Sequence, residues 1–485
     1  MREGKISIVF DCGATNVKVH AIDEKGEIIK SKSYPNNTRP DPLYPDYRIW
    51  DVDEIWEKMS KASLEVTYGL QAEDIIGVSV TTFGVDGALF SKEGQMLYPM
   101  ISWQCERTTP VMQGIDKYIP LEELYRESAL LPFNFNTINK LIWLKENRPE
   151  LVEKAHMWLF APSIFTWMLS GEMKNDITMA GTSMLTSASE RDFSSLILNS
   201  IGIDRSLLGH LAEPGEIIGN LTADAARLTG LPQGIPVVAS GHDTQFAVFG
   251  SGAGINQPVL SSGTWEILMV RSQNYMSGKE QLDNSISTEL DPIPGIYNIG
   301  NQWIASGMLE WAGRNMFPDC GDELHEKMIA LAGEVPPGSK GVKVVPRFFE
   351  ETGGRGGGQI KGLKMDSTRE EIYRAMLEAL SLRLREGMIA LEEAGGFTTR
   401  NILCVGGGSK NKLWNQIRTD ITGVPVTVID KKETTVLGAA MFIMYAAGPA
   451  ASPEEARDMI PFKTETFEPG ANRRIYNELF SDTES

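Results

Sequence analysis

The chain has 485 residues and a mass of 53.5 kDa, enough for two or three domains with buried cores, which excludes a small recognition module. Hydrophobic residues make up 42% and charged residues 23%, close to the globular average, so neither wholesale disorder nor a membrane bundle is expected. The net charge of −18 repels nucleic-acid phosphates and anionic lipid surfaces. We therefore expect no nucleic-acid partner and no membrane partner.

The cysteine pattern and the apolar runs indicate a cytoplasmic protein. The four cysteines lie far apart and form no C-x-x-C pair, which fits a reducing compartment. The apolar run at residues 6–10 ends at Asp11 and is too short for a signal peptide. Two uncharged stretches of spanning length, residues 244–265 and 434–453, are broken by glycine and proline. We interpret the second as a buried helix.

The first half of the chain begins with a predicted hairpin and continues as alternating helix and strand. β-rich segments at residues 6–10 and 17–22 flank a glycine-containing turn. Apolar residues spaced 4-3-4 from Ile55 to Val66 predict an amphipathic helix after acidic residues, and a strand is expected at residues 75–82. Residues 258–270 again read as strand, small-residue turn and strand, a faint repeat of the opening hairpin.

The second half predicts a long helix followed by a strand. Ser367 and Glu370 form a capping-box pattern, and one apolar face continues until Gly395 and Gly396. A strand at residues 402–405 then ends in glycines. The alternation favours an α/β fold. The best boundary is the glycine-rich segment 250–254, so we predict an N-terminal domain at 1–250, a C-terminal domain at 251–450 and an extension at 451–485.

The familiar phosphate-binding motifs are absent. The chain contains neither G-x-x-x-x-G-K-[ST] nor G-x-G-x-x-G, so a nucleotide would have to be bound by another arrangement. The glycine run Gly353–Gly358 resembles a phosphate cradle, but a flexible loop is the better interpretation and we assign it no chemistry. His325 and Glu326 begin like a metalloprotease helix, yet Ile329 stands where the second ligand should be, which favours a surface helix.

Two turns carry groups that suit a polyphosphate. Asp11 follows a strand and precedes Thr15 and Asn16, so its carboxylate could face a metal ion while backbone N–H groups and a hydroxyl face phosphate oxygens. The second hairpin offers Gly263 and Thr264 in a similar turn, which could bind the same polyphosphate from the other side. Each turn taken alone is more typical of a structural role.

A third segment places an acid at the carboxyl end of a strand. His242 and Asp243 follow the apolar residues 235–239, the position at which α/β active sites lie, and a carboxylate there can act as a base. The alternative, slightly favoured by this segment alone, is that Asp243 caps a helix starting near Thr244. For His242 the alternative is a satisfied histidine at a strand end.

Two further groups suit a purine ring and a sugar. Gly407, Gly408 and Asn411 join a strand to a predicted helix and would let the backbone approach a flat ligand, although a tight turn explains the glycines equally well.

Near the loop tips of the first half, polar groups stand beside aromatic residues, an arrangement that suits a sugar, with a buried ion pair as the alternative. These candidates are Gly84, Asp86, Trp103 and Arg107.

Several long segments together resemble the FGGY family of carbohydrate kinases. They are Thr-Thr-Phe-Gly-Val-Asp-Gly at 81–87, Asp-Ile-Thr-Met-Ala-Gly-Thr-Ser at 176–183, Gly-His-Asp-Thr-Gln-Phe-Ala at 241–247, Ser-Ser-Gly-Thr-Trp at 261–265 and Val-Gly-Gly-Gly-Ser at 405–409. The resemblance covers nearly the whole chain. It implies duplicated ribonuclease-H-like domains, of the actin and hexokinase type, flanking an ATP and sugar cleft.

The resemblance also implies the roles of the residues and the reaction. The catalytic base falls on Asp243, a Mg²⁺-linked aspartate on Asp11, phosphate contacts on Thr15, Gly263 and Thr264, and adenosine contacts around Gly407 and Asn411. The implied reaction is transfer of the ATP γ-phosphoryl group to the C1 hydroxyl of L-fuculose.

Three alternatives stay open at this point. Another ketose, L-rhamnulose or D-ribulose, could be the acceptor, and an actin-like ATP-dependent switch would need no sugar. For the assembly, a homodimer is one open option.

Overall fold

The computed structural model describes residues 4–318, 324–347 and 357–480, so residues 353–356 of the predicted glycine loop lie outside the described part. The chain divides into two compact units. The first comprises Met1–Gly252, Tyr275–Asn298 and Glu433–Pro461, and the second comprises Ala253–Asn274, Ile299–Lys432 and Phe462–Ser485. Both units combine sheets with helices, which confirms the predicted α/β class. The domain boundaries predicted near residues 250 and 450 stay a prediction.

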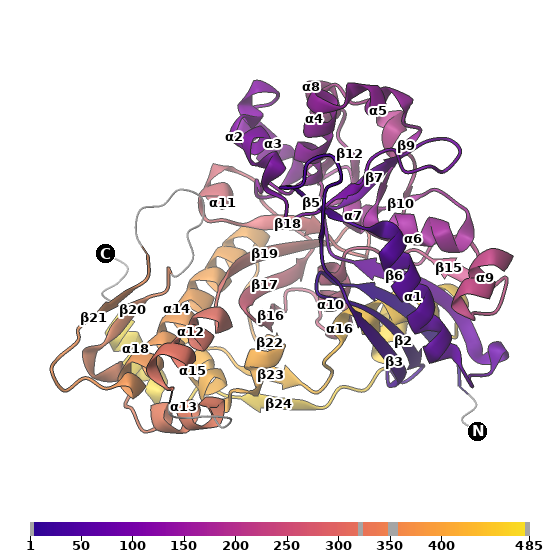
Figure 1. Ribbon diagram of the computed structural model, residues 1–485. Coiled ribbons are helices and arrows are strands. Elements are labelled where there is room, and N and C mark those ends of the chain that lie inside the picture. The colour runs from indigo at the N-terminus through magenta and orange to yellow at the C-terminus, as the bar shows by residue number, and fades with distance from the viewer. Residues whose placement is uncertain (1–3, 319–323, 348–356, 481–485) are drawn as a thin grey trace. The chain divides into compact units, whose positions relative to one another are not determined.

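The first unit is built on a six-stranded sheet with the strand order β14-β15-β6-β1-β2-β3 (Figure 1). The predicted opening hairpin is confirmed, because β1 pairs antiparallel with β2 from Ile6 opposite Asp23 to Cys12 opposite Val17. Strands β1 and β15 both run parallel to β6, so their carboxyl ends meet at one edge of the sheet. The strands are β1 (Ile6–Cys12), β2 (Asn16–Asp23), β3 (Ile28–Pro35), β6 (Ile75–Thr82), β14 (Ile217–Asn220) and β15 (Pro236–Val238).

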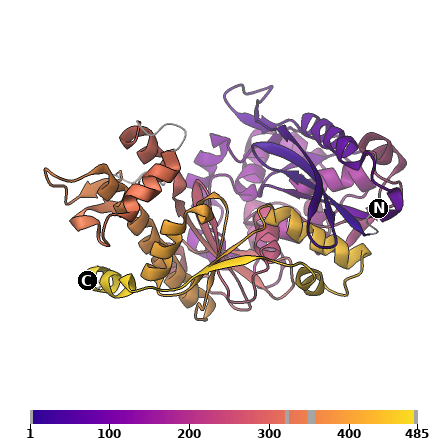
Figure 2. The ribbon, with the colours of Figure 1, turned by 90° about the horizontal axis from the view of Figure 1, so that it is seen from below.

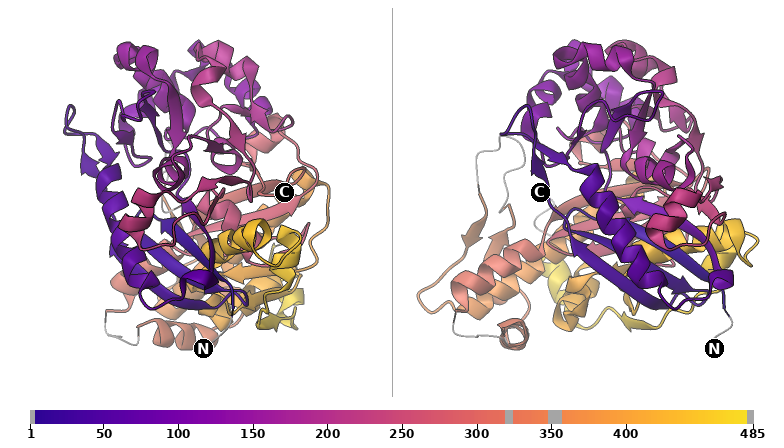
Figure 3. Two further views of the ribbon diagram at one scale, coloured as in Figure 1. Left: turned by 90° about the vertical axis from the view of Figure 1, so that its right-hand side faces the viewer. Right: turned by 45° about the vertical axis from the view of Figure 1, so that its right-hand side comes forward.

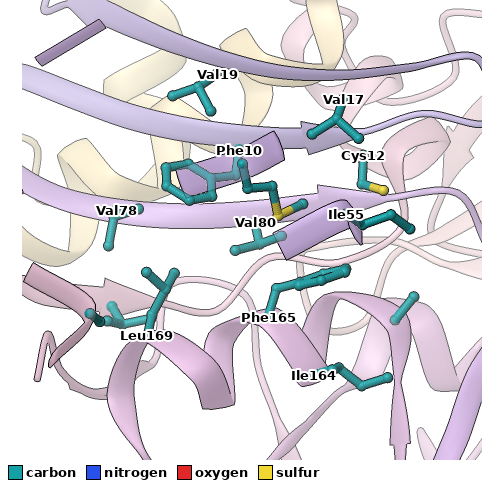
Figure 4. Packing of buried hydrophobic residues seen from close by; sticks show 14 of the residues in the cluster. Phe10, Cys12, Val17, Val19, Ile55, Val78, Val80, Ile164, Phe165 and Leu169 are labelled. Carbon is teal, nitrogen blue, oxygen red and sulfur yellow. The ribbon is translucent and has the colours of Figure 1, made fainter. Parts of the chain in front are cut away.

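One face of this sheet carries the main apolar core of the first unit. Alternate residues of β1 and β2, among them Phe10 and Val19, pack with helices α1 (Val52–Thr67), α6 (Ala161–Ser170) and α9 (Ala223–Thr229) (Figure 4). Helix α1 lies across the indigo strands in the right-hand view of Figure 3. Asp51 caps α1, because its carboxylate accepts a hydrogen bond from the Glu54 N–H at 3.0 Å.

The opposite face is covered by helix α16 (Thr434–Ala447), which the sequence predicted as a buried helix. Figure 2 shows α16 and α1 on opposite sides of the strands. Gly77 in β6 brings the sheet close to this helix, since an added Cβ would lie 3.1 Å from Ile443. Helix α10 (Asp243–Gly250) crosses α16 at Gly250 and Gly438, where any side chain would run into backbone of the other helix.

A mainly helical region with its own core completes the first unit. Its short strands β7 (Gly87–Phe90) and β9 (Met157–Phe160) pair antiparallel, directly after the predicted sugar-side segment 83–86. The other elements here are α2 (Thr109–Gln113), α3 (Leu121–Ser128), α4 (Thr137–Asn147), α5 (Pro149–Lys154), α7 (Ile177–Ala180), α8 (Ser195–Ile201) and α11 (Lys279–Asp283).

The second large sheet has seven strands in the order β18-β19-β17-β16-β22-β23-β24. The second predicted hairpin is confirmed, since β16 and β17 pair antiparallel from Val259 opposite Met269 to Ser262 opposite Glu266. The strands are β16 (Val259–Ser262), β17 (Trp265–Ser272), β18 (Ser287–Leu290), β19 (Tyr297–Ile304), β22 (Ile402–Val405), β23 (Val426–Ile429) and β24 (Thr464–Phe467).

The helices of the second unit include the predicted long helix, observed as α14 (Arg369–Gly395). Its capping box lies one residue later than predicted, because Thr368 has the extended backbone of an N-cap and pairs reciprocally with Glu371, whereas the Ser367 hydroxyl accepts from Lys364 in the preceding turn. The others are α12 (Ser306–Met316), α13 (Leu324–Gly333), α15 (Lys412–Thr422) and α18 (Asn472–Phe480), and α17 (Pro453–Asp458) belongs to the first unit.

Within the part of the chain that the structure describes, no helix combines the length and the apolar composition needed to cross a bilayer. His325 and Glu326 are exposed on α13, as the surface-helix interpretation predicted.

Candidate active site

The carboxyl ends of strands β1, β6 and β15 bring the predicted residues of the first unit together. The Thr82 N–H donates to the Gly241 carbonyl at 3.0 Å, which joins the segment after β6 to the segment after β15. Gly84 then lies against His242, because an added Cβ would stand 2.9 Å from its Nε2. A glycine at position 84 therefore lets the imidazole pack directly on the backbone.

Asp243 is the first residue of α10, and His242 occupies the N-cap position without making a side-chain cap. The Asp243 carboxylate accepts hydrogen bonds from the Thr244 N–H at 2.6 Å and the Thr244 hydroxyl at 3.2 Å, and 30% of the side chain is exposed. Burial raises the pKa of Asp243, and nearby His242 offsets this effect only in part. A carboxylate with a raised pKa is a stronger proton acceptor than an ordinary aspartate.

His242 belongs to a buried polar network that the sequence did not reveal. Its Nδ1 lies 2.9 Å from a carboxylate oxygen of Glu289, and its Nε2 lies 3.4 Å from Asp243. Gln245 also donates to Glu289 and accepts a hydrogen bond from Asn298. Burial lowers the pKa of His242, but Glu289 and Asp243 outweigh it, so the pKa lies above its ordinary value. The histidine is thus oriented by an acid on its far side.

A second unpredicted carboxylate supports the same loop. Asp176 caps α7 by accepting from the Met179 N–H at 3.0 Å, and it also accepts from the Thr178 hydroxyl. That hydroxyl in turn accepts from the His242 N–H at 3.0 Å. Burial raises the pKa of Asp176 to about 7. Gly241 passes so close to Asp176 and Thr178 that no side chain fits there. Segment 176–183, one of those that resemble the kinase family, contains both residues and was the sequence signal that pointed to them.

Asp11 is the penultimate residue of β1 and lies near Asp243 and Glu433. Burial, with the negative charges of Asp243 and Glu433, raises the pKa of Asp11 to about 7, although Lys18 acts in the opposite direction. The Thr81 hydroxyl lies 3.4 Å from its carboxylate. Carboxylate oxygens are the ligands that Mg²⁺ prefers, so Asp11 and Glu433 fit a divalent cation.

Hydrogen bonds within the turn after Asp11 fix its shape. The Gly13 N–H donates to the Asn16 carbonyl at 2.9 Å, and the Asn16 amide donates to the Thr15 hydroxyl at 3.1 Å. Thr15 itself is exposed.

Asp86 and Arg107 have the geometry of the alternative interpretation, buried ion pairs. Asp86 is fully buried, pairs with Lys140 and accepts from the Trp50 indole N–H at 2.7 Å. Arg107 is 2% exposed and lies 2.8 Å from Asp41. Both side chains are therefore engaged inside the protein, and the sequence lacked the signal because Asp41 and Lys140 lie far from them along the chain.

Trp103 is partly buried and contacts Asp86 through its backbone. Its backbone N–H donates to Asp86 at 3.0 Å, and its ring meets Phe135 edge-on at 6.2 Å between centroids. The indole N–H is buried and has no hydrogen-bond partner among the described residues. Phe83, which directly precedes Gly84, stacks on Trp50 with 4.7 Å between ring centroids. An unpaired donor beside aromatic rings suits a sugar hydroxyl.

In the second unit the predicted residues lie in two turns. The turn of the β16–β17 hairpin is closed by the Gly263 N–H, which donates to the Trp265 carbonyl at 3.0 Å, and Thr264 is exposed at its tip. Gly408 packs on Ser262 so closely that a side chain could not be added, whereas Gly407 is open. These contacts place the glycine turn after β22 against the end of β16.

Asn411 caps α15, since its side-chain oxygen accepts from the Trp414 N–H at 3.0 Å, and its amide NH₂ group makes no hydrogen bond among the described residues. Beneath the two turns, Arg418 and Glu266 form a fully buried ion pair that also holds the Ser262 hydroxyl, which accepts from Arg418 at 2.8 Å. The sequence did not predict this pair. The buried Arg418–Glu266 pair therefore supports both turns through Ser262.

Comparison with known proteins supplies the family. Residues 6–250 match the N-terminal domain, and residues 259–447 the C-terminal domain, of the FGGY family of carbohydrate kinases. L-fuculokinase from Escherichia coli (strain K12) is 44% identical over 476 residues, 98% of this chain and 99% of that protein. Rhamnulokinase from Bacteroides thetaiotaomicron is 27% identical over 430 residues, 86% of each chain. The structure of xylulose kinase from Rhodospirillum rubrum is similar with a TM-score of 0.90 at 21% identity, covering 99% of this chain and 98% of that one.

Proposed function

Because the chain belongs to the FGGY family of carbohydrate kinases, we propose that it transfers the γ-phosphoryl group of ATP to the C1 hydroxyl of L-fuculose, giving L-fuculose 1-phosphate. The observation that carries the choice of sugar is the 44% identity to an L-fuculokinase along almost the entire length of both chains, compared with 27% to a rhamnulokinase. The family membership and the carbohydrate kinase activity predicted from the sequence are thereby confirmed.

We propose that Asp243 accepts the proton of the C1 hydroxyl as that oxygen attacks the γ-phosphorus. Phosphoryl transfer passes through a loose transition state, so the protein contributes mainly alignment and charge stabilisation. The raised pKa of Asp243 and its partial exposure support this role. His242, held at Nδ1 by Glu289, would keep the Asp243 carboxylate in place through Nε2 and would line the sugar site.

The sugar would be bound by the segment after β6 and by Trp103. Gly84 leaves the imidazole of His242 uncovered by a side chain, and the unpaired Trp103 indole N–H is a donor for a hydroxyl. Asp86 and Arg107 would support the sugar site indirectly. Asp86 accepts a hydrogen bond from the Trp103 backbone, and Arg107 donates one to the sulfur of Cys105, two residues after Trp103.

Two hairpin turns carry the groups that we propose to contact the phosphates of the nucleotide. Thr15, Asn16, Gly263 and Thr264 would offer N–H groups and hydroxyls to phosphate oxygens, which is how glycine-containing turns bind anions. Gly407 and Gly408 would allow the adenine ring of ATP to approach the backbone closely, and the Asn411 amide group would donate a hydrogen bond to that ring. A Mg²⁺ ion held at Asp11 would supply neutralisation of the charge on the β- and γ-phosphates.

A coupled ADP-release assay across ketoses tests the proposal. We expect the highest kcat/KM with L-fuculose among L-fuculose, L-rhamnulose, D-ribulose, L-ribulose, D-xylulose and glycerol. The methyl group at C6 accounts for only about 10- to 200-fold discrimination, so hydroxyl partners must supply the rest. Preference for another ketose by about tenfold, or about 1.4 kcal/mol, would keep the kinase activity and overturn the choice of sugar.

A further inference from the structure

A cluster of metal-ligating side chains lies on the face of the first sheet that α16 covers. Strand residues alternate between faces, and Phe10, Val17 and Val19 belong to the core on the α1 side. Asp11 and His20 therefore point to the other face. Glu433 directly precedes α16, which packs on β1, β2 and β6 on that face. The topology thus brings two distant segments of one compact unit together.

The donor atoms of this cluster are close enough for one ion. A carboxylate oxygen of Asp11, a ring nitrogen of His20 and a carboxylate oxygen of Glu433 all lie within 4.8 Å of one another. Ligands of one ion at bond lengths near 2.1 Å stand at most about 4.2 Å apart, so a small side-chain adjustment would complete the coordination.

His20 supplies an independent sign of a ligand. It is only 2% exposed, and neither ring nitrogen has a hydrogen-bond partner among the described residues. Buried polar atoms nearly always have a partner, because an unsatisfied one costs about 1–3 kcal/mol. A buried imidazole beside two carboxylates and without a hydrogen bond is a nitrogen donor that lacks its acceptor.

We propose that Asp11, His20 and Glu433 form a protein-bound site for a divalent transition-metal ion, occupied without nucleotide. Mixed nitrogen and oxygen donors suit Mn²⁺, Co²⁺ and Zn²⁺, whereas Mg²⁺ prefers oxygen ligands alone. The proposal shares Asp11 with the proposed kinase site, but it goes beyond that function because the protein alone holds the ion.

Lys18 is the cation that such an ion would compete with. Its ammonium group lies 3.1 Å from a carboxylate oxygen of Glu433. A positive charge at this position repels a divalent ion held by the same carboxylate. Replacing Lys18 by methionine should therefore strengthen metal binding.

Electron paramagnetic resonance with Mn²⁺ tests the site on the full chain without nucleotide. We expect the wild type to bind one Mn²⁺, Zn²⁺ to displace it, and equal Mg²⁺ to leave it bound, following the affinity order of these ions. Glu433→Gln and His20→Gln each remove a proposed ligand and should weaken Mn²⁺ binding by about 10- to 100-fold or more. Loss of a residue that only hydrogen-bonds a metal ligand already has an effect of that size. The exposed His156→Gln is the matched control and should bind as the wild type does.

Pulsed resonance on the Mn²⁺-loaded wild type should also show coupling to an imidazole ¹⁴N, a result that needs no variant to fold. The proposal is overturned if the wild type retains no Mn²⁺ without nucleotide, if no ¹⁴N coupling appears, or if both variants bind normally. L-fuculose phosphorylation with Mg-ATP is measured in parallel. Either result can fail alone, which separates this site from the proposed kinase function.

Discussion

Asp243, His242 and Glu289 form a row of titratable side chains, with the imidazole of His242 between the two carboxylates. Glu289 and Asp243 both favour the protonated imidazole, and the imidazole partly offsets the burial that raises the pKa of Asp243. Perturbed pKa values that cluster in one buried polar network are typical of active sites. The basicity of Asp243 therefore depends on its distance from His242, and the charge of His242 depends on its distance from Glu289.

The first prediction concerns the proton acceptor. Asp243→Asn keeps the shape of the side chain and removes its basicity, so kcat should fall by about 10²- to 10⁴-fold, the usual contribution of a general base. Thermal unfolding should stay near that of the wild type. Asp224→Asn on the surface of α9 is the control, since its side chain is 88% exposed. Turnover near the wild-type level would show that Asp243 serves only the helix.

A second prediction concerns Glu289 and pH. Because the pKa of His242 is raised in the folded protein, protonation of His242 contributes stability that is full below its unfolded pKa of about 6.5 and is lost as the pH rises through the folded pKa. Glu289→Gln removes a charge that raises this pKa. The loss in free energy of unfolding should thus be larger at about pH 5.5 than at about pH 9.

Urea unfolding at both pH values measures this difference, with the exposed Glu280→Gln as control. An equal loss at both pH values would mean that Glu289 acts by packing and not through the charge of His242.

At the scale of elements, the site depends on where helices begin. Helix α10 begins at Asp243 and α15 begins after Asn411, so two of the predicted functional residues stand at helix N-termini. Helix α14, the longest, begins at a capping box and ends at Gly396 in the left-handed conformation. Its buried face supports β17 and β20 (Lys343–Val345) of the second unit.

The third prediction tests this cap. Thr368→Ala removes the hydroxyl that accepts from the Glu371 N–H, which should lower the free energy of unfolding by about 0.5–2 kcal/mol. Thr368→Ser retains the hydroxyl and should recover most of the loss, as measured by urea unfolding. KM values for ATP and ketose should not change. If serine destabilises as much as alanine, the methyl packing of Thr368 matters and the capping box does not.

At the scale of the whole molecule, each compact unit carries its own group of candidate ligand contacts. The first unit is assembled from three stretches of the chain, because α16 returns to cover the sheet made by the first 250 residues. The second unit contains the β16–β17 hairpin and the glycine turn on the Arg418–Glu266 pair. The proposed function assigns nucleotide contacts to Thr15 in the first unit and to Thr264 in the second.

The fourth prediction tests that assignment. Thr15→Ala in the first unit and Thr264→Ala in the second should each raise the KM for ATP by about 10- to 100-fold, the value of a hydrogen bond to a charged group, with little change in the KM for ketose. Thr464→Ala, at an exposed position of β24, is the control. A variant that changes only the ketose requirement would remove that turn from the nucleotide site.

The sequence by itself determined the local structure and the family. Alternation in residues 6–22 and 75–82, helical spacing from Ile55 to Val66 and glycine at helix ends are short-range signals, and the strands and helices follow them. The long matched segments identified the FGGY family, whereas the candidate base, turns and glycines were first singled out by residue type and position and then given roles by the resemblance.

Only the tertiary structure decided which side chains are already engaged. Asp86 pairs with Lys140, and Arg107 pairs with Asp41. His242 lies against Glu289. His20 lies near Glu433, which is more than 400 residues away along the chain. No local pattern encodes such pairs, because they form where separate strands and helices pack on one face. Burial there removes water as the alternative partner, so the neighbour in space determines the charge and the role of each group.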